Sequence, residues 1–242
     1  MVANALRESL RAVGSLFYPA TCVVCREAIE APEYLCATCR AKAPRITPPF
    51  CEKCSEPFPA AISGPFTCAN CAHRTLHFDA AVAAYRSRGI VRKLVHEFKY
   101  GHQRHLRHPL AAWLAETLDD PRLRDRRFDI IVPVPLHPTR ERERGFNQAL
   151  LLSENLSATS SLPLRSALER IRYTTTQTAH DRAERMENLR DAFRLRKNAD
   201  VRGLRVLLID DVLTTGSTLS ECARVLKAAG AISVHAATAA RA

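Results

Sequence analysis

The chain has 242 residues, 46% of them apolar, and a formal net charge of +11 at pH 7. The apolar content suffices for one large or two smaller globular domains, which excludes a wholly disordered chain, and no apolar run reaches the ~18 to 20 residues of a membrane-spanning helix. The positive charge favours polyanionic partners such as a diphosphate, a nucleotide or single-stranded DNA, although a solvated basic surface would give the same total.

Residues 1–19 are predicted to form an N-terminal helix. Apolar side chains recur with helical spacing at Leu6, Leu10, Val13, Leu16 and Phe17. Arg7 and Arg11 interrupt the apolar core that a secretory signal would need, so we expect a cytoplasmic protein. The helix is expected to pack on the next module, with peripheral contact to the inner face of the membrane as the alternative.

Residues 20–75 are predicted to form a small double zinc ribbon. Eight cysteines form four C-x-x-C pairs, namely Cys22/Cys25, Cys36/Cys39, Cys51/Cys54 and Cys68/Cys71. Each pair fits a zinc knuckle, and two pairs provide four thiolates, which leaves no open position for water and makes both Zn2+ ions structural. Disulfides are the alternative, and the missing export signal argues against them. Consecutive pairing is favoured and crossed pairing stays open, while the ninth cysteine, Cys222, is expected to be a core residue.

Residues 76–242 alternate between strand and helix patterns, which predicts an α/β domain. We expect strands over 78–85, 128–134 and 206–209, and helices over 90–100, 109–118, 148–157, 181–190 and 219–229. Two polar segments connect these elements. Residues 135–148 form a proline-stiffened loop with Arg140, Arg142 and Arg144, whose forked donors match diphosphate oxygens unless Glu141 and Glu143 neutralise them.

The second polar segment, residues 170–180, is basic and hydroxyl-rich. It is predicted to be either a mobile flap over a site or an ordinary surface connection.

The most specific pattern lies at residues 206–218, where four apolar residues precede an acidic pair and a hydroxyl-rich turn with one glycine. A turn between a strand and a helix N-terminus binds phosphate well, because its backbone amides and the helix dipole favour an anion. The carboxylates of Asp210 and Asp211 only accept hydrogen bonds, which suits two vicinal ribose hydroxyls. A strand followed by a solvated Asx turn is the alternative.

These thirteen residues resemble the signature of the type I phosphoribosyltransferases. The resemblance implies that Asp210 and Asp211 bind the ribose hydroxyls of phosphoribosyl pyrophosphate (PRPP). The residues implied to bind its 5-phosphate are Thr214, Thr215, Gly216, Ser217 and Thr218. The flap would close to exclude water from the reacting ribosyl centre.

The whole chain resembles the ComF family of bacterial competence proteins, which join a double zinc ribbon to a phosphoribosyltransferase domain. Beyond the cysteine pairs and the PRPP signature, the matching segments are residues 98–100, 132–138, 144–148, Arg170, Thr174, Gln177, Arg185, Asn188 and 192–193. Thr175, Thr176 and His180 depart from the family's flap pattern. Gly101 follows Tyr100 directly, whereas the corresponding glycine of the family stands one residue further along.

This resemblance implies a type I phosphoribosyltransferase fold, with a mostly parallel sheet flanked by helices, behind the N-terminal ribbon. It implies that PRPP binds with Mg2+, and it adds Arg140, Arg144, Asn147 and Gln148 to the PRPP site. The residues it implies for catalysis are Asp210, Asp211, Lys99 and Arg144.

Three functions follow as hypotheses. The first is a competence factor that binds PRPP and engages incoming single-stranded DNA or a DNA-translocating helicase or ATPase. The second is a phosphoribosyltransferase with an unknown nitrogenous acceptor, and the third is a PRPP sensor without chemistry.

Overall fold

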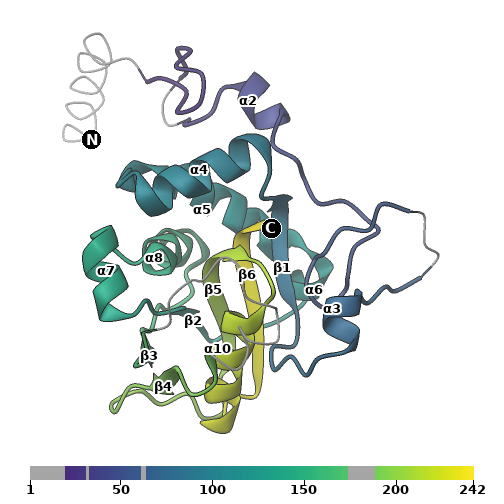
Figure 1. Ribbon diagram of the computed structural model, residues 1–242, viewed down its shortest axis with the longest axis vertical. Coiled ribbons are helices and arrows are strands. Elements are labelled where there is room, and N and C mark those ends of the chain that lie inside the picture. The colour runs from purple at the N-terminus through teal and green to yellow at the C-terminus, as the bar shows by residue number, and fades with distance from the viewer. Residues whose placement is uncertain (1–19, 31–32, 61–63, 174–188) are drawn as a thin grey trace, which may run out of the picture. The chain divides into compact units, whose positions relative to one another are not determined.

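The computed structural model describes residues 20–30, 33–60, 64–173 and 189–242 (Figure 1). The predicted N-terminal helix, flap residues 174–180 and most of the predicted helix 181–190 lie outside these ranges. The chain divides into two compact units, Met1–Ala43 and Pro44–Ala242. The second cysteine cluster therefore belongs to the same unit as the α/β domain, and the predicted limits at residues 19 and 75 stay predictions. In the ranges that the structure describes, no helix is both long and apolar enough to cross a bilayer.

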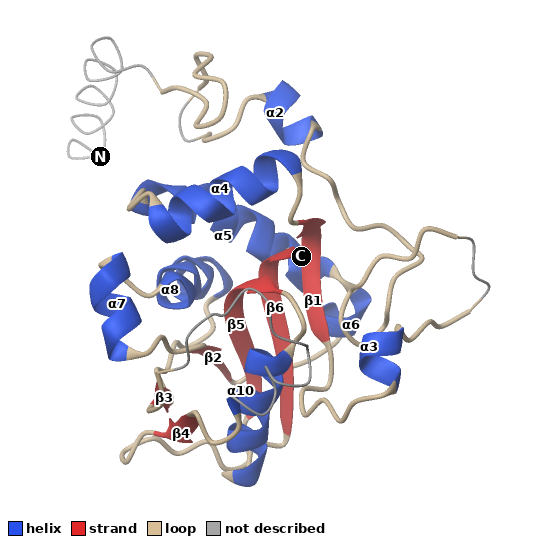
Figure 2. Ribbon diagram, viewed as in Figure 1, coloured by secondary structure: helices blue, strands red, loops and turns tan. Residues whose placement is uncertain are grey.

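The second unit is built on a four-stranded parallel sheet with the order β1-β6-β5-β2 (Figure 2). The strands of this sheet are β1 (Ala81–Arg86), β2 (Ile130–Pro133), β5 (Arg205–Leu213) and β6 (Ser233–Arg241). A separate antiparallel pair consists of β3 (Leu168–Arg170) and β4 (Phe193–Leu195). The expectation of a parallel sheet flanked by helices is confirmed.

Helices cover both faces of the parallel sheet. In the described part of the second unit, the α-helices are α3 (Ala69–Ala72), α4 (Gly89–Tyr100), α5 (Arg107–Ala115), α6 (Pro121–Arg124), α7 (Pro138–Arg144), α8 (Gln148–Ser160) and α10 (Ser217–Ala228), with 3-10 turns at Arg104–Leu106 and Glu116–Asp119. Helix α2 (Ala37–Ala41) belongs to the first unit. Val206 and Leu208 of β5 share one core cluster with Leu226 of α10. Leu207 and Ile209 are fully buried on the opposite face, where α5 and α8 pack, because successive strand residues point to opposite sides.

Most predicted elements are present, with shifted ends. Strand β5 continues past residue 209 through the acidic pair, because its backbone stays paired with β6 as far as Leu213 and Arg241. Strand β1 begins at Ala81 rather than at residue 78, and α5 begins two residues early and ends in a 3-10 turn.

The expectation that residues 135–148 form only a loop is wrong, because α7 lies inside it. Pro138 occupies the first turn, where its missing N–H costs nothing, and the His137 ring nitrogen accepts a hydrogen bond from the Thr139 amide at 3.3 Å. Gly145 ends the helix in the left-handed region with φ 76°.

Candidate functional site

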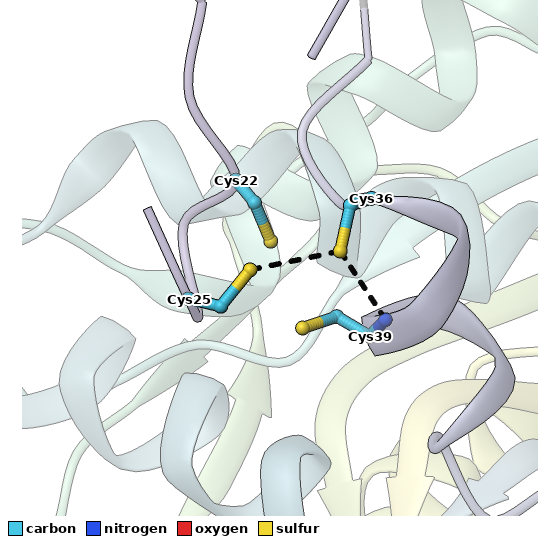
Figure 3. A group of neighbouring side chains, drawn as sticks. All are labelled: Cys22, Cys25, Cys36 and Cys39. Carbon is cyan, nitrogen blue, oxygen red and sulfur yellow. Dashed lines mark hydrogen bonds between the residues drawn. The ribbon is translucent and has the colours of Figure 1, made fainter. Parts of the chain in front are cut away.

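The eight paired cysteines form two four-thiol clusters of consecutive pairs. In each cluster the sulfur atoms all lie within 4.8 Å of one another. The clusters are Cys22, Cys25, Cys36 and Cys39 (Figure 3), and Cys51, Cys54, Cys68 and Cys71. All of these cysteines are free thiols, which agrees with metal binding rather than disulfide bonding.

The spacing of the sulfurs suits zinc. The sulfur atoms of Cys25 and Cys36 lie 3.6 Å apart in the first cluster, and those of Cys54 and Cys68 lie 3.6 Å apart in the second. Four thiolates bound tetrahedrally to zinc at about 2.3 Å are about 3.8 Å apart. The two sites thus fit two structural zinc ions held entirely by protein thiolates, with the consecutive pairing that sequence order favours.

The same local backbone builds both clusters. In the first, the Arg26 amide donates to the Cys22 carbonyl at 2.9 Å, and in the second the Ser55 amide donates to the Cys51 carbonyl at 2.8 Å. Arg26 and Ser55 both take positive φ, 68° and 58°, directly after the second cysteine of the pair. In the other pair of each cluster, the first cysteine precedes a short helix, α2 or α3, and the second lies inside it. The chain therefore repeats one metal-binding unit twice.

The acidic pair lies near the carboxyl end of the central strand β5, where α/β sheets commonly bind ligands. Lys99, the penultimate residue of α4, forms an ion pair with Asp211, with 2.8 Å between Nζ and Oδ1. Asp211 is 6% exposed. The structure thus brings together three of the four residues predicted for catalysis.

The charged side chains of Asp210, Asp211 and Lys99 influence one another's ionisation. Burial and the neighbouring Asp211 carboxylate raise the pKa of Asp210 from 3.8 to about 7, against the attraction of Lys99. Burial opposes the charge on Lys99, but the two carboxylates outweigh it and raise the pKa of the ammonium group. A bound cation would therefore favour the ionised form of the buried Asp210 carboxyl.

The predicted phosphate turn, residues 214–218, connects β5 to α10. Gly216 caps α10 with φ 79°, a conformation that glycine adopts without strain. The hydroxyls of Thr215 and Ser217 lie 2.9 Å apart and form a hydrogen bond. The turn therefore sets hydroxyls and the amino end of a twelve-residue helix together, as the sequence predicts.

Asn147 and Gln148 are buried, and their hydrogen bonds hold neighbouring elements of the site in place. Asn147 donates to the Val134 carbonyl at 3.1 Å and accepts from the Leu150 amide at 3.3 Å, which ties the end of β2 to α8. Gln148 accepts a hydrogen bond from the Arg144 guanidinium at 2.9 Å. These contacts position α8 and Arg144, and a direct contact with PRPP stays a prediction.

Arginines lie near the acidic pair, and two of them stack on tyrosine rings. Arg144 lies over the Tyr100 ring at 5.1 Å, and Arg140 lies over the Tyr173 ring at 5.5 Å. Arg170 in β3 is close enough to Asp210 for each to shift the pKa of the other. The arrangement offers planar cationic donors beside carboxylate and hydroxyl acceptors, which suits a sugar bearing phosphate groups.

Three further residues of this site were not predicted from the sequence. Arg170 was assigned only to the flap and the family pattern, and its place at the end of a short strand carries no local signal. Asn70 lies between Cys68 and Cys71, and Arg74 lies just after Cys71; both donate to the Thr215 carbonyl at 3.2 Å. Residues so far apart in sequence come together only through the tertiary fold.

Two family patterns match the chain. Residues 13–72 match the family described as "Double zinc ribbon domain", and residues 143–242 match "Phosphoribosyl transferase domain". Among solved structures, "adenine phosphoribosyltransferase from Thermoanaerobacter pseudethanolicus" is similar, with 18% identity, a TM-score of 0.35 and coverage of 57% of this chain and 70% of that one. The "allosteric regulatory enzyme of purine biosynthesis" gives 20% identity and a TM-score of 0.40 over 60% of this chain, which spans 30% of that enzyme.

Curated relatives match over most of the length. "Competence protein F" of Haemophilus influenzae is 32% identical over 88% of this chain and 93% of its own. "DNA utilization protein YhgH" of Escherichia coli K12 is 31% identical over 91% and 96%, and "Competence protein ComFC" of Bacillus subtilis is 31% identical over 80% and 78%. With its two cysteine clusters and its phosphoribosyltransferase fold, the chain belongs to the ComF family of competence and DNA-utilization proteins.

Proposed function

We propose that this protein binds PRPP together with Mg2+ and acts on incoming single-stranded DNA in the cytoplasm. The observation that carries the proposal is the placement of Asp210 and Asp211 near the carboxyl end of β5, two residues before the hydroxyl-rich turn that leads into α10. Carboxylates and a phosphate-binding turn at this spacing match the ribose and 5-phosphate of one ligand.

Each part of PRPP has a matching group. The 214–218 turn would bind the 5-phosphate, and the carboxylates would accept from the ribose 2- and 3-hydroxyls. Arg140, Arg144 and Arg170 would bind the diphosphate through paired donors. Mg2+ prefers oxygen ligands from carboxylates and substrate phosphates, and its charge would offset both the burial and the Asp211 repulsion that raise the pKa of Asp210.

The proposed DNA-binding surface is the exposed face of α4. Val91, Leu94, Val95 and Phe98 are buried on one side of this helix. The opposite side presents Arg92, Lys93, His96 and Tyr100 to solvent. Tyr100 is 56% exposed and can stack on an unpaired base, while the cations contact the backbone phosphates. The names of the relatives, competence and DNA-utilization proteins, support this role.

The aromatic side chains of the second cysteine segment are less available for base stacking than Tyr100. Phe58 and Phe66 pack on each other with ring centroids 4.7 Å apart. Both side chains are half-buried. We therefore place base stacking at Tyr100.

Transfer of phosphoribose to a nitrogenous acceptor is the second candidate. The observation that favours it is the pKa of Asp210, which burial and Asp211 raise to about 7. A carboxylate with this pKa can accept a proton from an acceptor amine near neutral pH. In that reaction the acceptor nitrogen would bond to the ribose C1 while the bond from C1 to the diphosphate oxygen breaks.

A calorimetric titration of PRPP with and without Mg2+ tests ligand binding. Changing Asp210 and Asp211 together to asparagine should weaken binding at least tenfold, and unaltered affinity would refute the site.

Diphosphate release is then measured with and without single-stranded DNA. Release with an added amine or base supports the transferase, and PRPP binding with neither release nor strand binding supports a sensor. Strand binding that is absent even at low ionic strength would make the DNA role indirect, through a DNA-translocating ATPase.

A further inference from the structure

Residues beside the second cysteine cluster hold the phosphate turn in place. Asn70 lies between two zinc ligands in α3, and its side-chain amide donates to the Thr215 carbonyl at 3.2 Å. Arg74 donates to the same carbonyl at 3.2 Å and to the Ser217 hydroxyl at 2.9 Å. Arg74 also donates to the Asn70 side-chain oxygen at 2.7 Å, so the two side chains form one connected network.

This network fixes the direction of the turn's backbone donors. In a trans peptide the carbonyl of one residue and the amide of the next point to opposite sides. Two donors hold the Thr215 carbonyl toward Asn70 and Arg74, so the Gly216 amide must point away from them. The hydroxyls of Thr215 and Ser217 are fixed in turn by their mutual hydrogen bond and by Arg74. The phosphate donors are therefore oriented before any ligand binds.

The network depends on the second metal site. Helix α3 has only four residues, and no side chain caps its amino end, so Cys68 and Cys71 determine its position. The four cysteines of this cluster share a hydrophobic core with Phe78. The Phe78 ring lies so close to Gly216 that a side-chain carbon at this position would be 3.4 Å from it. The first cluster lies in the other compact unit of the chain.

We propose that Asn70 and Arg74 are positioning residues for the phosphate turn, and that zinc at Cys51, Cys54, Cys68 and Cys71 maintains the affinity for the 5-phosphate. Zinc at the first cluster has no such effect. This inference rests on the proposed function, because it assigns the 5-phosphate to the turn at residues 214–218. It predicts that two sites with the same ligands have different roles.

The first experiment compares two ligands on the zinc-loaded full chain. Ribose 5-phosphate probes the turn, and inorganic diphosphate probes the arginines around Asp210. Arg74→Ala should weaken ribose 5-phosphate binding about tenfold, the effect of losing charge-assisted hydrogen bonds, and should change diphosphate binding less than twofold. Arg202→Ala is the matched control, because Arg202 is exposed and pairs with Asp200 away from the turn. Equal weakening of both ligands, or no effect on either, would overturn the proposal.

Arg74→Lys separates positioning from direct contact. A lysine keeps the charge but cannot supply the forked donors that reach Thr215, Ser217 and Asn70 together. Positioning predicts that Arg74→Lys binds ribose 5-phosphate nearly as weakly as Arg74→Ala. Recovery of wild-type affinity would show a direct charge contact instead and would overturn the positioning role.

The second experiment compares equivalent zinc ligands. Cys36→Ser and Cys68→Ser change the cysteine that precedes α2 and α3, respectively, and each should lower the zinc content by one ion. Only Cys68→Ser should weaken ribose 5-phosphate binding. Equal effects of the two variants would refute the link to the second site, and if Cys68→Ser does not fold, Asn70→Ala tests the same connection with every ligand intact.

Hydrogen exchange in the ligand-free protein separates this inference from the proposed function. If the wild-type protein binds neither PRPP nor ribose 5-phosphate, the proposed function fails. The network would still predict faster amide exchange at Gly216 and Ser217 in Arg74→Ala than in Arg202→Ala. Unchanged exchange at both amides would refute the network itself.

Discussion

Asp210→Asn is expected to stabilise the ligand-free protein while weakening PRPP binding. Burial and the Asp211 charge raise the pKa of Asp210 from 3.8 to about 7, so the folded protein resists ionising this carboxyl. Above pH 7 the ionised group lowers the free energy of unfolding, by at most about 4 kcal/mol for a change from 3.8 to about 7. Asparagine removes this penalty and keeps the size and polarity of the side chain.

The pH dependence gives the sign of the effect. Below pH 3.8 the carboxyl is protonated in both states, and the variant should match the wild type. Between pH 4 and 7 the unfolded chain releases the proton first, so wild-type stability falls as pH rises, and the advantage of the variant grows. Above pH 7 the difference should be constant. At pH 8 a gain of about 2 kcal/mol would raise the melting temperature by about 4 to 8 °C.

Urea unfolding of the zinc-loaded protein from pH 4.5 to 8.5 measures the difference. Asp129→Asn serves as a control that should lower the free energy of unfolding, because hydrogen bonds from Arg205 hold the pKa of Asp129 at about 2. That stabilisation is present above pH 3.8, so the control should be less stable than the wild type by a constant amount across the series. An Asp210→Asn variant that is less stable at pH 8, or whose effect does not change with pH, would refute the reasoning.

Three further predictions concern metal, turn and surface. Elemental analysis of freshly purified protein should find two zinc ions per chain, and chelation should unfold both cysteine clusters; well under two would contradict the ligand assignment. Gly216→Ala should cost about 1 kcal/mol, because φ is 79°, and should weaken PRPP binding, whereas Gly203→Ala, at φ 74°, should cost the same without affecting PRPP. Single-strand affinity should fall log-linearly with salt at ~0.7 per phosphate contact, and Arg92→Ala with Lys93→Ala should reduce that slope; a flat response would reject the surface.

Local sequence predicts those parts of the structure that local contacts determine. Cysteine spacing gives both metal clusters, because a C-x-x-C turn needs only its own backbone. The apolar run before Asp210 and the spacing of α10 give the central strand and the helix that hold the turn. Helix α4 follows from the spacing of Val91, Leu94 and Phe98.

Long-range contacts determine most of what sequence reasoning missed. Strand β5 extends through Asp211 because β6 pairs with it. Helix α7 is the exception, because its contacts are local and a histidine stands in place of the usual capping residues. Asn70 and Arg74 resemble ordinary polar residues of a ribbon, and only the fold brings them to Thr215. The ion pair between Lys99 and Asp211 likewise depends on how α4 packs.

The strand order affects how this protein can fold. Strand β6 lies between β1 and β5, so Ala81 pairs with Ala236 across most of the second unit. During synthesis β1 emerges long before its partner, and its alanine-rich edge stays unpaired until β6 is made. Such non-local pairing slows folding and exposes strand edges to aggregation. Residues 233–241 are therefore the segment that completes the sheet, and a newly made chain that lacks them would need protection by chaperones.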